Sequence, residues 1–154
     1  MDASLMFLAK DVRNKTLRIL ADLTEAEAGF KAPGLTNSIL WHAGHALTVV
    51  EHLAVVRLTG GNPSYPAGWF QSFSWKSNPA AVTSWPTLEQ VRAQLNSQLN
   101  TLLPLIERAT EEQLNAVYDP AKGATVRWSI VHGLQDEAGH QGEIWLLKKM
   151  ARRR

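Results

Sequence analysis

Histidines and a carboxylate recur at fixed spacing near the C-terminus, and these residue types are common ligands of divalent metals. Trp128, His132, Asp136 and His140 follow one another four residues apart. Residues four apart on an α-helix are neighbours on one face, so a carboxylate and an imidazole in this row can bind one metal ion. The pair is either His132 with Asp136 or Asp136 with His140, because helical residues eight apart are separated by about 12 Å.

A third ligand has to come from elsewhere in the chain, because two side chains on one helix make a weak site. The second histidine-rich stretch, Leu-Trp-His-Ala-Gly-His at residues 40–45, is the obvious donor. His42 and His45 are three residues apart, so both can point to the same side of a helix. A lone histidine is more often structural than a ligand, and the prediction therefore requires that the two helices face each other.

The absence of cysteine and the weak net charge restrict the chemistry. Without cysteine, disulfides, thiolate metal sites and a cysteine nucleophile are excluded, and a transition-metal site must use histidine, carboxylates and water. The net charge is +2. The one basic cluster, Arg152–Arg154, is predicted to be a solvated helix end, since no second basic cluster or aromatic platform accompanies it. We expect no nucleic-acid partner.

Length and composition predict one domain, residues 1–154. Apolar residues make up 45% of the chain, enough for a core, and the low share of charged residues, 19%, favours a surface shared with a partner subunit. The N-terminal residues lack the basic and apolar regions of a signal peptide, and no stretch approaches the roughly 18 apolar residues of a membrane span. The expected protein is cytoplasmic, with no membrane partner.

Apolar residues at helical spacing predict four long helices. The first covers residues 3–23, the second begins near Thr36 or Asn37 and ends at Gly60–Gly61, the third begins after Thr87, and the last covers residues 125–150.

Shorter elements are expected between the long helices. Capping-box patterns that begin at Thr24 and Thr110 each predict a short helical turn, and Pro104 is expected to kink the end of the third helix. Residues 118–124 are predicted to be a loop, and no strand is predicted. The expected fold is therefore all-α, a four-helix bundle with one long connection.

That connection, residues 61–86, is called the crossover below. It contains four prolines and six aromatic residues, whereas disordered linkers are poor in aromatics. We expect an ordered segment with a short helix near residues 67–73. Long ordered loops often act as lids or binding loops. The aromatic residues either have such a role or only anchor the segment.

Two glycines, Gly139 and Gly142, flank His140 inside the last predicted helix. A glycine inside a helix costs about 1 kcal/mol relative to alanine. The pair predicts either tight helix packing or the close approach of another backbone or a ligand.

The two histidine-rich stretches together resemble the DinB/YfiT-like superfamily. The matching segments are SILWHAGH at residues 38–45 and DEAGHQGEI at residues 136–144, and the crossover, ending in PTLEQV, is similar too. The resemblance covers nearly the whole chain. It implies a four-helix bundle in up-down-down-up order, a homodimer, and a divalent metal bound by three histidines.

Carried over by position, the resemblance assigns the metal ligands to His45, Asp136 and His140. The family has a histidine where this chain has Asp136. Two histidines and one carboxylate still make a competent site for nickel, zinc, iron or manganese; the alternative is a member that has lost its metal. Ligating histidines usually donate their other ring N–H to a neighbouring group, and the candidates for this second layer are His42, Glu137 and Glu143.

The resemblance also implies an activity. Characterised relatives include metal-dependent enzymes that use low-molecular-weight thiols, so the expected function is a thiol S-transferase acting on a small molecule. The alternative is a non-catalytic homodimeric module, metal-free or with a vestigial site, that binds a small hydrophobic ligand. Convergence of the three ligands on an open site favours the enzyme.

Overall fold

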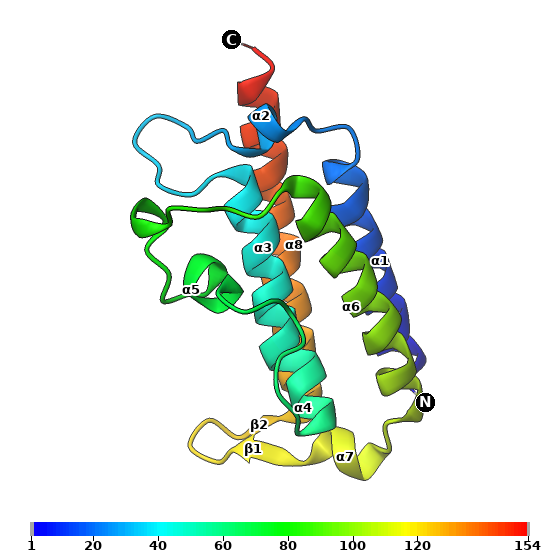
Figure 1. Ribbon diagram of the computed structural model, residues 1–154. Helices are drawn as coiled ribbons and strands as arrows, with labels where there is room; N and C mark the ends of the chain where they lie inside the picture. The colour runs from blue at the N-terminus through cyan, green and yellow to red at the C-terminus, as the bar shows by residue number, and fades with distance from the viewer. Residues whose placement is uncertain (1, 154) are drawn as a thin grey trace.

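The computed structural model describes residues 2–153, which are mostly helical, and this confirms the predicted all-α class (Figure 1). The helical elements are α1 (Ala3–Leu20), α2 (Glu25–Ala28), α3 (Ile39–Val50), the π-helical turn η1 (Glu51–Val55), α4 (Val56–Thr59), α5 (Trp69–Phe73), the 3-10 turn η2 (Pro79–Ala81), α6 (Leu88–Arg108), α7 (Glu111–Asn115) and α8 (Val126–Ala151). The strands are β1 (Val117–Asp119) and β2 (Ala124–Thr125).

The long helices α1, α6 and α8 and the segment from α3 to α4 lie side by side (Figure 1). The chain rises through α1, descends through α3, η1 and α4, descends again through α6, and rises through α8. Two successive descending segments need a long connection between them, and the crossover supplies it. The crossover carries α5, which packs against α3.

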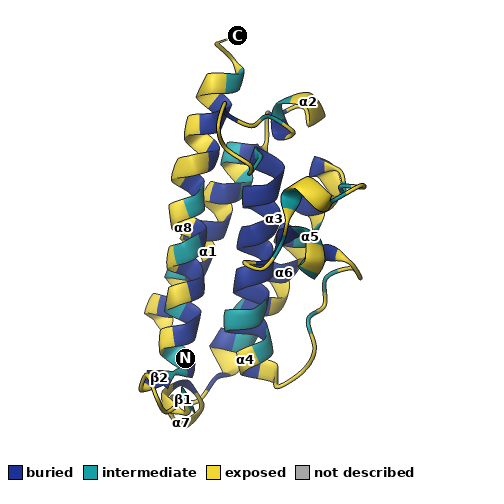
Figure 2. Cartoon of the chain, turned by 90° about the vertical axis from the view of Figure 1, so that its left-hand side faces the viewer, coloured by how far each residue is buried: buried dark blue, intermediate teal, exposed yellow. Residues whose placement is uncertain are grey.

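The segment that begins with α3 is the central helix of the fold. Every residue of α3 is buried, as the dark blue ribbon in Figure 2 shows. Contrary to the expectation that no segment reaches membrane length, Ile39–Thr59 is long and apolar enough to do so, but 83% of its most apolar window is buried inside the protein. Such burial is typical of the core helix of a soluble protein, and it places the histidines of α3 inside the fold.

Several helix starts agree with the capping residues read from the sequence. Thr24 accepts a hydrogen bond from the backbone N–H of Glu27 and completes a capping box, and Thr87 and Thr110 cap α6 and α7. The prediction for the second helix was wrong, because Ser38 is the cap: its Oγ lies 3.1 Å from the backbone nitrogen of Trp41. The first helix ends at Leu20 rather than Leu23.

The prediction that the chain contains no strand was wrong. β1 and β2 pair antiparallel across a turn in which Gly123 has a φ of +62°, a conformation that glycine adopts at little cost. Strands of three and two residues are too short for an alternating pattern to be recognised. The hairpin brings the chain to the start of α8, whose first turn is capped by Thr125.

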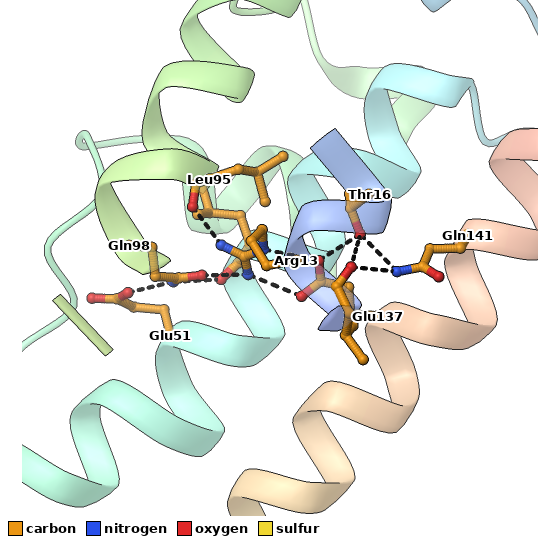
Figure 3. Close-up of polar contacts among 9 residues, drawn as sticks. Arg13, Thr16, Glu51, Leu95, Gln98, Glu137 and Gln141 are labelled. Atoms are coloured by element: carbon orange, nitrogen blue, oxygen red, sulfur yellow. Dashed lines mark hydrogen bonds and ion pairs between the residues drawn. The ribbon is translucent and has the colours of Figure 1, made fainter. Parts of the chain in front are cut away.

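A buried ion pair joins α1 to α8 in the centre of the bundle (Figure 3). The Arg13 guanidinium donates to both carboxylate oxygens of Glu137, at 2.8 and 2.9 Å, and to the carbonyl of Leu95 at 2.6 Å. Thr16 donates to the same carboxylate at 2.6 Å, and Gln141 donates to Thr16 at 2.9 Å. These bonds compensate two charges that would otherwise be costly to bury.

The same network extends through α6 to the crossover. Arg13 donates to the side-chain oxygen of Gln98 at 2.7 Å, and the Gln98 amide donates to the carbonyl of Leu47 and to Glu51. The other oxygen of Glu51 accepts two hydrogen bonds from Ser64, both at 2.8 Å. A continuous chain of hydrogen bonds therefore connects the four long helical segments to the start of the crossover.

We predict that Glu137→Leu lowers the free energy of unfolding by about 3–5 kcal/mol, because it leaves the Arg13 charge buried without a counter-ion. Urea denaturation measures the change. The exposed carboxylate of Glu107 on α6 provides the control, and Glu107→Gln should change stability by less than about 0.5 kcal/mol. Combining Glu137→Leu with Arg13→Met should recover most of the loss. A harmless Glu137→Leu would contradict the assigned role of the pair.

Candidate metal centre

Three side chains predicted from the sequence as metal ligands meet between α3 and α8. Asp136 Oδ2 lies 3.7 Å from His45 Nε2 and 3.5 Å from His140 Nε2, and the potential ligand atoms of the three residues all lie within 4.8 Å of one another. His132, one turn earlier on α8, is exposed and stacks on Trp128 instead. The structure thus pairs Asp136 with His140 rather than with His132.

The hydrogen bond that His45 makes to the crossover decides which of its nitrogens is free. His45 Nδ1 lies 2.6 Å from the carbonyl oxygen of Phe73. A carbonyl oxygen only accepts hydrogen bonds, so the neutral imidazole carries its proton on Nδ1. Its Nε2 then presents a lone pair toward Asp136, and this is the form that binds a metal.

Asp136 Oδ2 is the decisive atom of the cluster. Among the described residues, it is the only buried side-chain nitrogen or oxygen without a hydrogen-bond partner. A buried polar atom without a partner is costly, and this one faces the Nε2 atoms of two histidines. A divalent cation bound among these atoms would satisfy all of them, so the residues present fit a metal.

The far nitrogen of His140 is held by a second cluster. Glu143 Oε2 lies 2.5 Å from His140 Nδ1 and 3.0 Å from His42 Nδ1, and the two Nδ1 atoms are 2.9 Å apart. These spacings would also suit a metal, but here the polar atoms already bond to one another. A carboxylate that accepts from Nδ1 keeps Nε2 of His140 unprotonated, which is the usual arrangement behind a ligating histidine.

Glu137, expected beside the histidines, lies elsewhere. It is fully buried and binds Arg13 and Thr16, because adjacent residues on a helix point in directions about 100° apart. His42 and Glu143 are the members of that expected set that reach His140.

Burial keeps the histidines of α3 neutral. Desolvation lowers the pKa of His42 to about 4, against the opposing effect of the Glu143 charge. Desolvation also lowers the pKa of His45, although its bond to Phe73 acts in the opposite direction. Both rings are therefore uncharged at neutral pH, the form in which a histidine binds a metal.

Two residues outside the predicted ligand set support His45. The Trp41 ring stacks on the His45 ring with centroids 4.5 Å apart and an interplanar angle of 13°. Gly44 lets α5 approach, because a Cβ on this residue would lie 2.3 Å from the Phe73 ring. The sequence signal of this contact was a glycine between two histidines inside a predicted helix, where glycine is unfavourable.

The other notable glycines have no such role. Gly139 and Gly142 are exposed. Apart from their chain neighbours and the adjoining backbone of α8, no described atom lies within 4 Å of the position a Cβ would take. Tight packing within the chain, one interpretation of their spacing, is therefore wrong.

A comparison with known families now adds to the geometry. The family model described as the DinB superfamily matches residues 8–144. The chain belongs to the DinB superfamily. Its fold is similar to the crystal structure of a conserved protein from Enterococcus faecalis, with a TM-score of 0.76 and 17% identity over 100% of this chain and 99% of that chain. Among curated proteins, none matches the chain. The comparisons establish family and fold, without an activity.

We predict that His42 titrates near pH 4 in the metal-free protein, as followed by NMR of its ring. Its usual pKa is 6.5, so between about pH 6.5 and 4 the unfolded chain binds a proton that the folded chain does not. The contribution of His42 to the free energy of unfolding should therefore fall as the pH drops through this window. His42→Gln should show a shallower decline in stability than the wild type. A midpoint near 6.5 would contradict the burial argument.

Proposed function

We propose that this DinB-superfamily protein, an up-down-down-up four-helix bundle, binds one divalent metal through His45, Asp136 and His140. The observation that carries the proposal is the buried, unpartnered oxygen of Asp136 facing two imidazole nitrogens. Ligand atoms bound at about 2.0–2.2 Å to one metal lie roughly 3–3.6 Å apart, close to the 3.7 and 3.5 Å that separate Asp136 Oδ2 from the two histidine nitrogens. Two histidines and a carboxylate suit nickel, zinc, iron or manganese.

We further propose that the protein is an enzyme, a thiol S-transferase acting on a small molecule. A divalent metal with open coordination positions would lower the pKa of a thiol or water that binds it. Three protein ligands leave such positions on a four- to six-coordinate metal. The proposal keeps the cytoplasmic location expected from the sequence, and cell fractionation would test it.

The surrounding side chains have defined tasks in this scheme. Trp41 covers one face of the His45 ring and keeps water from it. Glu143 holds the proton of His140 at Nδ1, so that Nε2 stays available. The low pKa of His42 leaves it neutral beside His140, where it adds no positive charge that would oppose a cation.

Elemental analysis of protein purified without a metal-affinity tag tests the metal site. We expect about one metal per chain in the wild type, and its loss in Asp136→Ala and His140→Ala. His132→Ala is the matched control, an exposed histidine on the same helix, and should retain the metal. Glu143→Gln should weaken binding by about 10–100-fold, the usual effect of removing a partner of a ligating histidine.

The outcomes separate the proposed function from its alternative. If metal is bound, transfer of small thiols to electrophiles becomes the activity to assay with the same variants. If no metal binds even after loading with nickel, zinc, iron and manganese, the proposal is wrong, and the non-catalytic module remains.

We also propose that the chain forms a homodimer. On α8, the adjacent apolar side chains of Trp145 and Leu146 are 49% and 55% exposed, and exposed apolar surface often marks an interaction site. Sedimentation equilibrium should give twice the chain mass of 17.1 kDa. Trp145→Glu should shift the protein toward the monomer, and a monomeric wild type would contradict the proposal.

A further inference from the structure

We infer that the crossover, residues 61–86, positions His45. Docking of the crossover on α3 and metal binding by His45 then strengthen each other. The inference rests on the proposed metal site but concerns residues outside it. Two contacts carry it: the bond from His45 to the backbone of Phe73 and the bond from Trp41 to Ser77.

The first contact is direct. His45 Nδ1 donates to the carbonyl oxygen of Phe73 at 2.6 Å, at the end of α5. This bond fixes both the tautomer and the orientation of the ring, since Nε2 must then point away from the crossover toward Asp136. An undocked crossover would leave the ring free to rotate and to exchange its tautomer.

The packing under this contact is tight. Phe73 is fully buried and lies against the backbone of Gly44. Its ring also contacts Trp69 and Trp85, with centroid separations of 5.5 and 5.4 Å. The carbonyl that orients His45 thus belongs to a residue held by two other aromatics of the crossover, which gives these three side chains a role beyond anchoring.

The second contact is indirect. The Trp41 indole, stacked on His45, donates from Nε1 to Ser77 Oγ at 2.9 Å. Ser77 lies in the crossover, beyond α5, and its own backbone N–H donates to the carbonyl of Ser74. The crossover therefore holds His45 at Nδ1 and also holds the ring that covers its face.

Docking of the crossover and metal binding are linked because a bound cation would strengthen the hydrogen bond from His45 to Phe73. Metal bound at Nε2 would draw electron density from the ring and make Nδ1–H a stronger donor, and charge-assisted hydrogen bonds are roughly twice as strong as neutral ones. The bond to Phe73 would strengthen, and with it the docking of α5. Linkage is reciprocal, so the metal must bind the undocked form more weakly by the same factor by which it favours docking.

Hydrogen–deuterium exchange with and without Zn²⁺ tests the docking half of the linkage. The backbone amides of Ser74 and Ser77 bond within the crossover, both at 2.9 Å. They should exchange more slowly in the zinc-bound protein by about fivefold or more, the range of typical coupling factors. The amide of Val126, bonded to Ala116 at the hairpin end of the bundle, is the internal control and should not change.

Zinc affinity in variants tests the reciprocal half. Ser77→Ala removes the acceptor of Trp41 without touching a ligand and should weaken zinc binding by about fivefold or more. Ser72→Ala is the matched control, because the Ser72 hydroxyl bonds only to Gly68 within the crossover, and its zinc affinity should stay within twofold of wild type. Gly44→Ala, which forces Phe73 off α3, should weaken zinc binding further if circular dichroism shows that the variant folds.

Each outcome decides between the proposals. Slower crossover exchange on zinc binding together with weaker binding by Ser77→Ala supports the linkage. Zinc bound with unchanged exchange at Ser74 and Ser77, or equal affinities for Ser77→Ala and Ser72→Ala, overturns the linkage and leaves the metal site standing. A protein that binds no zinc or other divalent metal overturns both.

Discussion

The buried ion pair between Arg13 and Glu137 is the interaction on which the rest of the arrangement depends. It fixes the rotation of α8 against α1, because a carboxylate with no exposure has to face its guanidinium partner. Once Glu137 points into the bundle, its neighbour Asp136 must point about 100° away, toward α3. His140, one turn later, follows Asp136. The geometry of the candidate metal centre on α8 is therefore set by a contact on another face of the same helix.

Burial of α3 constrains the histidines that α3 contributes to the candidate metal centre. An apolar helix buried all round has few ways to satisfy polar side chains, so each of its histidines needs a specific partner. His45 donates to the carbonyl of Phe73, and His42 lies within hydrogen-bond distance of Glu143 and His140. Of the buried side-chain nitrogens and oxygens in residues 2–153, only Asp136 Oδ2, between the helices, is left without a partner. That imbalance distinguishes the candidate metal centre from an ordinary hydrogen-bonded core network.

The crossover joins these two constraints. Near its start, Ser64 binds Glu51, and Glu51 continues through Gln98 to Arg13 and the ion pair. Further along it, the carbonyl of Phe73 and the hydroxyl of Ser77 support the site on α3. A segment that is irregular over most of its length thus contacts both the network that orients α8 and the groups that orient His45.

The sequence alone determined the helices, most of their caps, and the small set of residues from which a site could form. These features depend on local spacing and on side-chain bonds a few residues long, so the long helices and the capping boxes at Thr24 and Thr87 were predictable. The cap at Ser38 was missed because Thr36 and Asn37 are capping residues of the same kind. The hairpin was missed because its strands are too short to show an alternating pattern. The place of Asp136 in the site came from family resemblance, since spacing left His132 and His140 as equal partners.

Only the tertiary structure decided which of the candidates meet. The neighbouring residues Asp136 and Glu137 are both carboxylates. The rotation of α8 against α1 and α3 decides that Asp136 lies in the candidate metal centre and Glu137 in the buried ion pair. That rotation is set by contacts between residues more than a hundred positions apart, such as Arg13 with Glu137. The contribution of Phe73 is a backbone carbonyl, which every residue possesses and no sequence pattern marks.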